Sequence, residues 1–344
     1  MVCGWINRGI GAVQAAGPAG LLALAAILCD TRAATAERGT RIALSLPLDC
    51  AREACFLQNM VDRVSGPGRQ DGWCGNATFD GHKGTDIRVA DLPAMRRGVD
   101  VLAPAPGRVV RVRDGIADRL VRTPAEREAV RDRECGNGLV IDHGGGWTTQ
   151  LCHLARGSLR VEAGERVTRS QPLGRVGLSG MTTFPHVHLA LRRGKRLIDP
   201  MTGREAERAC LEGRPPGRGL WDDAARTVLA PGPERIVAAG FAGGPVNAGQ
   251  LMEGRVPAPR AGGPLVVFVQ AINMARGDRL VLRLVSPDGE AREATGRPLE
   301  RHQASYTAFH GLRRAGPGRW TGRVDWLRGE RIVATREGLA IELD

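Results

Sequence analysis

The sequence predicts an all-β protein in which an antiparallel β-sheet domain with a groove is followed by a small C-terminal β-sandwich. Short segments of alternating apolar and polar residues recur between turns rich in Gly and Pro. No amphipathic helix of convincing length interrupts them before residue 213. From about residue 234 the alternation becomes more regular and histidine clusters disappear. At 344 residues with 42% apolar content, the chain is long enough for two domains with real cores.

Residues 1–36 are expected to be a signal peptide. Arg8 precedes an apolar run whose centre, Leu21 to Leu28, is far shorter than the roughly 20 residues of a membrane-spanning helix. Ala34-Thr35-Ala36 then matches the A-x-A pattern of small residues at which a signal peptide is cleaved. A short N-terminal helix is the alternative. We therefore expect export, to the periplasm first and the extracellular space as the alternative, without stable membrane insertion after the signal is removed.

Composition divides the remaining chain into a domain at 37–213, a linker at 214–233 and a second domain at 234–344. Pro215 and Pro216 between glycines mark the linker. In the first domain, strands are expected at 41–48, 87–89, 99–102, 107–113, 139–142, 147–154 and 184–191, with a short surface helix within 122–133. In the second, an immunoglobulin-like sandwich is expected from strands at 236–241, 265–273, 279–285, 319–327 and 331–341.

Six cysteines remain after removal of the signal, an even number in a chain addressed to an oxidising compartment, so up to three disulfides are expected. We favour a bond between Cys135 and Cys152 because they flank a predicted hairpin. A zinc ribbon is disfavoured because no C-x-x-C pair exists. The six are Cys50, Cys55, Cys74, Cys135, Cys152 and Cys210.

The net charge of +12 does not predict a nucleic-acid partner. Lys83 and Lys195 are the only lysines, and the arginines are spread along the whole chain without an aromatic-interleaved basic patch. The charge is best read as compositional bias that helps the protein to approach an acidic envelope.

The segment FPHVHLAL, residues 184–191, places two histidines on one face of a strand. Side chains two apart share a face, so His186 and His188 lie side by side, whereas Val187, Leu189 and Leu191 form an apolar opposite face. An H-x-H pair alone is about equally compatible with two metal ligands and with two polar residues on a solvent-exposed strand face.

The segment GHKGTD, residues 81–86, carries His82 and Asp86 four positions apart. Gly81 and Gly84 argue against a helix. On an extended segment four is an even number, so both side chains can point the same way. The alternative is a turn with a capping Asp and a surface His.

Three further histidines need separate interpretation. Strand alternation groups Thr149, Leu151 and His153 on one face and sets Cys152 on the other, so Cys152 is expected to face away from any site that uses His153. His143, beside a glycine turn, is expected to make a structural hydrogen bond. His302 and His310 lie in the second domain and receive no role.

These residues together predict one hydrolytic zinc site. Such a site takes three protein ligands and keeps a position open for water. His82, Asp86 and one member of the H-x-H pair supply three ligands. The other member and His153 would lie at the rim, where they can orient the water, accept its proton and stabilise an oxyanion.

In this order, GHKGTD, LCHL around His153 and PHVHL resemble the LytM/lysostaphin-like zinc metallopeptidases of cell-wall remodelling, over roughly residues 46–201. The resemblance implies an antiparallel β domain with a long groove, one Zn²⁺ and cleavage of the peptide cross-links of peptidoglycan. It assigns His82, Asp86 and His188 as metal ligands and His153 and His186 as catalytic residues. The six cysteines and the insertion at 122–133 depart from the family's smaller members and affect the expected groove walls.

Two other classes of protein remain as alternatives. A non-catalytic LytM-like module would bind cell wall or activate an amidase, but such modules typically lose ligands, and all five positions are filled here. A secreted adhesin or carbohydrate binder would hold a structural metal in a closed four-ligand site, whereas these residues fit three ligands with two more histidines nearby.

Overall fold

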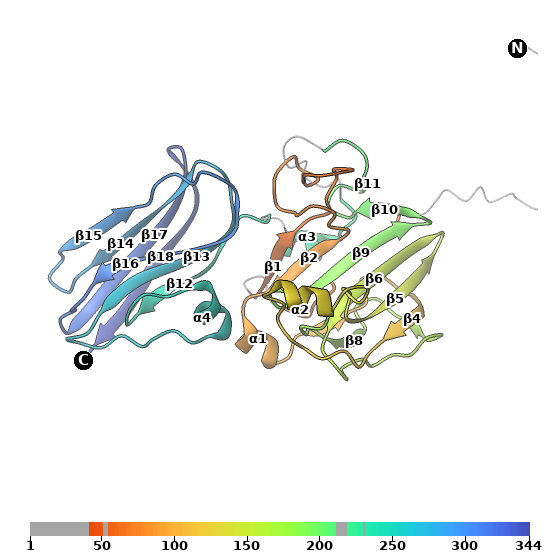
Figure 1. Ribbon diagram of the computed structural model, residues 1–344, viewed down its shortest axis with the longest axis horizontal. Coiled ribbons are helices and arrows are strands. Elements are labelled where there is room, and N and C mark those ends of the chain that lie inside the picture. Colours follow the sequence, from red (N-terminus) through yellow and green to blue (C-terminus); the bar gives the residue numbers. More distant parts are fainter. Residues whose placement is uncertain (1–40, 51–53, 211–218, 230–231) are drawn as a thin grey trace, which may run out of the picture. The chain divides into compact units, whose positions relative to one another are not determined.

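The computed structural model describes residues 41–50, 54–210, 219–229 and 232–344, so the predicted signal peptide lies outside the described residues. Two separate groups of antiparallel strands follow each other along the chain (Figure 1). Each group has its own buried cluster of apolar side chains. The prediction of an all-β protein with a C-terminal sandwich is confirmed.

The first domain is built on a nine-stranded sheet in which β9 lies between β2 and β6, so that segments distant in sequence become neighbours (Figure 1). A two-stranded sheet of β3 and β8 contributes to the same core. The large sheet contains β1 (Cys55–Asn59), β2 (Thr85–Val89), β4 (Gly107–Arg113), β5 (Asn137–Gly144), β6 (Trp147–Leu154), β7 (Arg166–Val167), β9 (His186–Arg193), β10 (Arg196–Asp199) and β11 (Arg204–Glu205), and the small one β3 (Asp100–Leu102) and β8 (Pro172–Arg175).

Alternation along β9 separates the core from the functional face, as predicted. Val187, Leu189 and Leu191 are fully buried in the first core. His186 and His188 therefore share the opposite face of the sheet. Because each buried aliphatic side chain contributes about 1.5–3 kcal/mol, the apolar face fixes the register of the strand and with it the direction of both imidazoles.

Two segments of the first domain differ from their predicted structure. Residues 41–48 were expected to form a strand, but they make only isolated bridges, Leu44 with Trp221 and Leu48 with Val101. Residues 220–229, placed in the linker by composition, include α3 (Asp223–Leu229), and Leu220, Trp221, Ala225 and Leu229 are buried in the first core. Apolar residues at helical spacing thus outweigh the neighbouring prolines.

The helices of the first domain are short. α1 (Leu92–Arg96) is capped by Asp91, and α2 (Pro124–Ala129) has a capping box formed by Thr123 and Glu126. α2 lies in the insertion at 122–133 and buries no side chain, which confirms the expected surface helix. Among the residues that the structure describes, no helix is long and apolar enough to cross a membrane.

The second domain consists of a three-stranded and a four-stranded sheet whose inner faces share one core. All five predicted strands are present, and two more, β15 and β16, were not predicted. A helix, α4 (Ala248–Glu253), follows the first strand. The sheets contain β12 (Arg235–Ala242), β13 (Leu265–Met274) and β16 (Gln303–Leu312), and β14 (Asp278–Val285), β15 (Ala291–Thr295), β17 (Gly318–Arg328) and β18 (Arg331–Leu343).

All six cysteines after residue 36 are paired, within the first domain. The bonds join Cys50 to Cys55, Cys74 to Cys210 and Cys135 to Cys152. The predicted bond at the base of the β5–β6 hairpin is therefore confirmed.

Candidate metal centre

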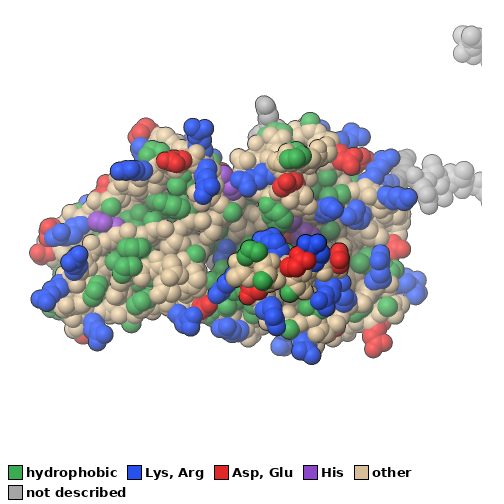
Figure 2. Space-filling view, in the orientation of Figure 1, with side chains coloured by type: hydrophobic (Ala, Val, Ile, Leu, Met, Phe, Trp, Pro, Cys, Tyr) green, Lys and Arg blue, Asp and Glu red, His purple; other side chains and the backbone are tan. Residues whose placement is uncertain are grey.

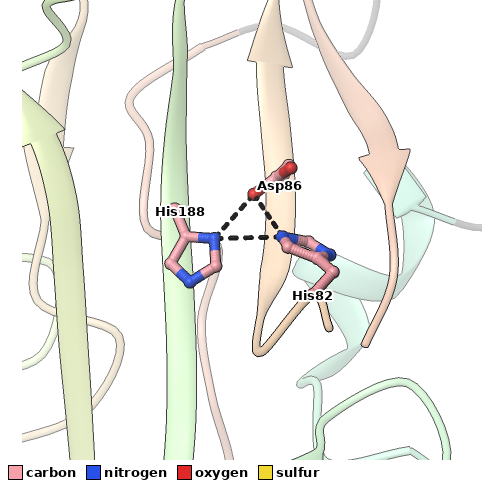
Figure 3. A group of neighbouring side chains, drawn as sticks. All are labelled: His82, Asp86 and His188. Carbon is pink, nitrogen blue, oxygen red and sulfur yellow. Dashed lines mark hydrogen bonds and ion pairs between the residues drawn. The ribbon is translucent and has the colours of Figure 1, made fainter. Parts of the chain in front are cut away.

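Strand pairing brings the three predicted ligands together. Asp86 on β2 is the register partner of His188 on β9, and opposite residues of antiparallel strands point to the same face. His82 reaches the same point from the loop before β2 (Figure 3). His82 Nε2 lies 3.1 Å from Asp86 Oδ1 and 3.2 Å from His188 Nδ1, and the latter two atoms are 2.8 Å apart. Among the residues that the structure describes, these three side chains form a group whose ligand atoms lie close enough together to hold one metal ion.

His82 is oriented by the backbone on its far side. Its Nδ1 donates to the carbonyl of Met60 at 2.7 Å, which leaves the lone pair of Nε2 directed at Asp86 and His188. The loop is held by Asp62, whose carboxylate accepts hydrogen bonds from the amides of Val64, Gln70 and Gly81. Met60 and Asp62 were not singled out in the sequence, because nothing in their spacing marks a contact with His82.

Asp86 is buried and fully engaged. Asn59, its neighbour on β1, donates to Oδ2 at 2.8 Å, while Oδ1 faces the histidines. Burial alone would raise the pKa of Asp86. The neighbouring His82 and His186 imidazoles, with hydrogen bonds from His188 and His82, outweigh burial and hold this pKa well below its ordinary value. The carboxylate is therefore ionised at neutral pH, the form that binds a cation.

His186 lies beside the three-residue group. Its Nδ1 donates to the carbonyl of Phe184 at 2.9 Å and lies 3.0 Å from Thr182 Oγ1, and its Nε2 is 3.5 Å from Asp86 Oδ1. The Phe184 ring packs against the imidazole of His186, tilted to it, with the two ring centroids 4.6 Å apart. Burial lowers the pKa of His186, so the ring is neutral near pH 7.

His153 reaches the site through an unusual backbone conformation. Its φ is +67°, a left-handed value that is uncommon for residues other than glycine. Its amide donates to the Cys135 carbonyl at 2.9 Å and its Nδ1 to the Ser179 carbonyl at 2.8 Å. Its ring centroid is 4.6 Å from that of His186. Burial, reinforced by His186 and His188, lowers the pKa of His153 well below its ordinary value.

The same conformation corrects the expectation for Cys152. Cys152 is the register partner of His188, so its side chain lies on the face of the metal-ligand candidates, not away from it. Simple alternation would send His153 to the core face with Thr149 and Leu151, both fully buried. The left-handed residue breaks the alternation and returns the imidazole to the site.

The remaining histidines lie elsewhere. His143 Nδ1 lies 2.8 Å from the Pro106 carbonyl and its Nε2 2.8 Å from Thr149 Oγ1, consistent with the structural hydrogen bond expected of it. His302 precedes β16 and His310 lies on it, in the second domain. The structure therefore brings all five predicted site residues together and leaves the others apart.

The donor set suits a transition metal of the zinc type. Ligands at ~2.0–2.1 Å from a tetrahedral ion are themselves about 3.3 Å apart, close to the observed separations. Two imidazole nitrogens and one carboxylate oxygen leave one tetrahedral position without a protein ligand. Such an arrangement is typical of hydrolytic metal sites and differs from the closed four-ligand sites that only stabilise a fold.

The first domain is similar to metallopeptidases in sequence. Residues 80–200 match the model of Peptidase family M23, which confirms the resemblance predicted from the motifs. The matched segment contains all five site residues.

Two curated relatives and one solved structure are similar to parts of this chain. An "Uncharacterized metalloprotease" of Haemophilus influenzae is 29% identical over 121 residues, 35% of this chain and 20% of the relative. "Peptidoglycan DD-endopeptidase ShyA" of Vibrio cholerae is 36% identical over 66 residues, 19% of this chain and 15% of the relative. The catalytic domain of lysostaphin from Staphylococcus simulans aligns with a TM-score of 0.28 at 18% identity, over 42% of this chain and 88% of that domain. This chain thus spans a fifth or less of the two curated relatives.

Proposed function

We propose that the protein is an exported zinc metalloendopeptidase that hydrolyses peptide cross-links of peptidoglycan. One observation carries the proposal: His82, Asp86 and His188 converge within 3.2 Å of one another, with His153 and His186 beside them. The match of residues 80–200 to Peptidase family M23 supports the reaction class. The name of the Vibrio cholerae relative supports peptidoglycan as the substrate.

His82, Asp86 and His188 would hold the zinc ion. The ion, when bound, supplies Lewis-acid chemistry: it polarises the scissile carbonyl and lowers the pKa of water into the neutral range. The hydrogen bonds from His82 to the Met60 carbonyl and from Asn59 to Asp86 fix the direction of the ligand atoms before the ion arrives.

His153 and His186 would move the proton and bind the oxyanion. Both donate Nδ1–H to backbone carbonyls, which leaves each Nε2 as the reactive atom. Because burial lowers the pKa of both rings, an unprotonated Nε2 is present near pH 7 and can accept a proton from the attacking water. The imidazolium so formed can then stabilise the oxyanion and protonate the leaving amine.

The test compares zinc content and wall-lysing activity of the wild type with those of His186→Ala. The proposal predicts zinc retained and activity lost in the variant. Mass spectrometry of the released muropeptides identifies the peptide bond that is cut. Zinc-loaded wild type that releases no peptide would contradict the enzyme proposal.

The second candidate is a non-catalytic module that binds cell wall or activates an amidase. The two histidines with lowered pKa beside the ligand group argue against it, because a binding module has no use for a base there. Under this alternative His186→Ala would leave wall binding unchanged and no hydrolysis would be seen in either protein.

A further inference from the structure

A second concave site lies at the far end of the strand that bears His186 and His188. It opens beside the hairpin of β9 and β10 and has a volume of about 600 Å³, within the range of small-molecule sites. We call it the arginine pocket. It is lined chiefly by Arg41, Trp147, Arg193, Arg196, Arg204 and Arg208.

The charge of the arginine pocket is strongly one-sided. Five guanidinium groups line it, against a single carboxylate, Glu205, which is paired with Arg196 at 2.8 Å. Within the described part of the chain, Arg193, Arg204 and Arg208 have no carboxylate partner. The whole chain has 49 Lys and Arg against 37 Asp and Glu, so its composition does not account for five basic side chains to one acidic side chain in the arginine pocket. Like charges gathered in one hollow repel each other, and an oxyanion relieves that repulsion.

Several of these guanidinium groups are held in place. Arg193 stacks over the Trp147 ring with its Cζ 5.2 Å from the ring centroid. Arg41 donates to the carbonyl of Gly219 at 2.9 Å, and Arg196 is fixed by Glu205. The turn glycines Gly146 and Gly194 also line the pocket, where the lack of side chains lets a ligand approach the backbone. Planar guanidinium groups in fixed positions suit bidentate binding of carboxylate or phosphate.

The arginine pocket is separate from the metal centre. His188 and Arg193 are five positions apart along β9, which is ~17 Å of extended chain. The odd spacing sets the two side chains on opposite faces of the sheet. Figure 2 shows Lys and Arg side chains at this end of the first sheet, near the position of β10 in Figure 1. A ligand in the arginine pocket would therefore leave the metal centre open.

We propose that the arginine pocket binds an oxyanion-bearing part of the wall polymer, carboxylate or phosphate, apart from the peptide that is cleaved. The identity of the polymer rests on the proposed function, whereas the anion site does not. Occupancy of this pocket would hold the polymer on the enzyme while the metal centre acts on a peptide elsewhere on the sheet. Small soluble peptides without such groups would not use it.

The test is calorimetric titration of the whole chain with inorganic tripolyphosphate and, separately, with citrate. The variant Arg204→Gln/Arg208→Gln removes two guanidinium groups from the arginine pocket. The control Arg313→Gln/Arg314→Gln removes the same charge from exposed positions of the second domain. Losing two charge-assisted contacts should weaken binding roughly tenfold or more in the first variant and less than about twofold in the control. The probe that binds more tightly assigns phosphate or carboxylate as the source.

Hydrolysis of a short uncharged peptide should be unchanged in Arg204→Gln/Arg208→Gln. The proposal is overturned if the wild type binds neither probe, or if the control weakens binding as much as the pocket variant does. It is also overturned if a DNA duplex binds more tightly than either probe and loses binding in the pocket variant. Failure of the wild type to hydrolyse peptides would sink the proposed function, yet it would leave the calorimetric result standing.

Discussion

At the scale of single residues, Gly84 shows how closely the ligand group is packed. A Cβ atom at this position would lie 2.5 Å from Cε1 and Nε2 of His188 and 2.7 Å from the Leu189 carbonyl oxygen. We expect Gly84→Ala to displace the His188 ring and to lower zinc affinity about 10–100-fold, as changes around a ligand do. Competition with a chelator measures the affinity. Gly316→Ala is the control, because no atom lies within 4 Å of the Cβ built there; equal affinities in both variants would contradict the packing argument.

His153 allows its chemistry to be separated from its backbone. Both His153→Ala and His153→Asn remove the imidazole, so both should retain zinc and lose hydrolysis by roughly 10²–10⁴-fold. Asn tolerates the left-handed conformation at φ +67° better than Ala does. We therefore expect the Asn variant to unfold at a higher denaturant concentration than the Ala variant. Loss of zinc in both variants would instead make His153 a ligand.

Asp199 should make stability depend on pH. Burial raises its pKa to about 6, although Arg63 lies 3.5 Å away and Met201 and Thr202 donate hydrogen bonds to it. A raised pKa means that the native state binds the proton more tightly than the unfolded state does. Protonated Asp199 therefore stabilises the fold below about pH 4, and this stabilisation is lost as pH rises through 6. The free energy of unfolding of the wild type, relative to Asp199→Asn, should fall by about 2 kcal/mol between pH 4 and pH 7. Denaturant titrations at each pH measure it, and parallel profiles for the two proteins would refute the prediction.

The sequence predicts which residues gather at the site better than how they are held. Even spacing correctly pairs His186 with His188, because alternation is a property of the strand itself. The positions of Asn59, Met60 and Ser179 depend on pairing between distant segments, which one sequence does not display. The left-handed backbone of His153 was missed for a different reason, since a histidine in a strand pattern does not by itself signal a positive φ.

At the scale of elements, the disulfides should differ in what they contribute to stability. Cys74 and Cys210 are separated by 136 positions, and Cys50 and Cys55 by 5. Loop-closure entropy predicts about 5 kcal/mol for the longer loop and about 2 kcal/mol for the shorter one. Replacing each pair by serine and measuring denaturant unfolding tests the order. A larger loss from the Cys50–Cys55 pair would show that chain entropy does not dominate.

The elements that were predicted correctly are those with at least one buried face. β9 and β17 alternate in sequence because one face packs on a core, and β13 is a largely apolar run that is buried along its whole length. β15 and β16 were missed since most of their side chains are exposed or half-buried, and exposed strands need not alternate. Residues 41–48 alternate, yet their backbone pairs only at isolated bridges, so their apolar side chains serve packing without a ladder.

At the scale of the whole molecule, the two domains have separate cores and divide the functional residues unequally. All five site residues, all three disulfides and the arginine pocket lie in the first domain. The first domain is therefore sufficient to explain the proposed chemistry. The second domain is a seven-stranded sandwich, and the proposed chemistry does not depend on it.

The central claim is that three side chains from two separate segments bind one ion and leave a position open. Anomalous diffraction at the zinc edge from crystals of the zinc-loaded protein tests it most directly. The account predicts a single strong peak about 2.0–2.2 Å from His82 Nε2, Asp86 Oδ1 and His188 Nδ1, with His153 and His186 outside coordination distance. A peak held by four protein ligands, or located away from these three atoms, would contradict it.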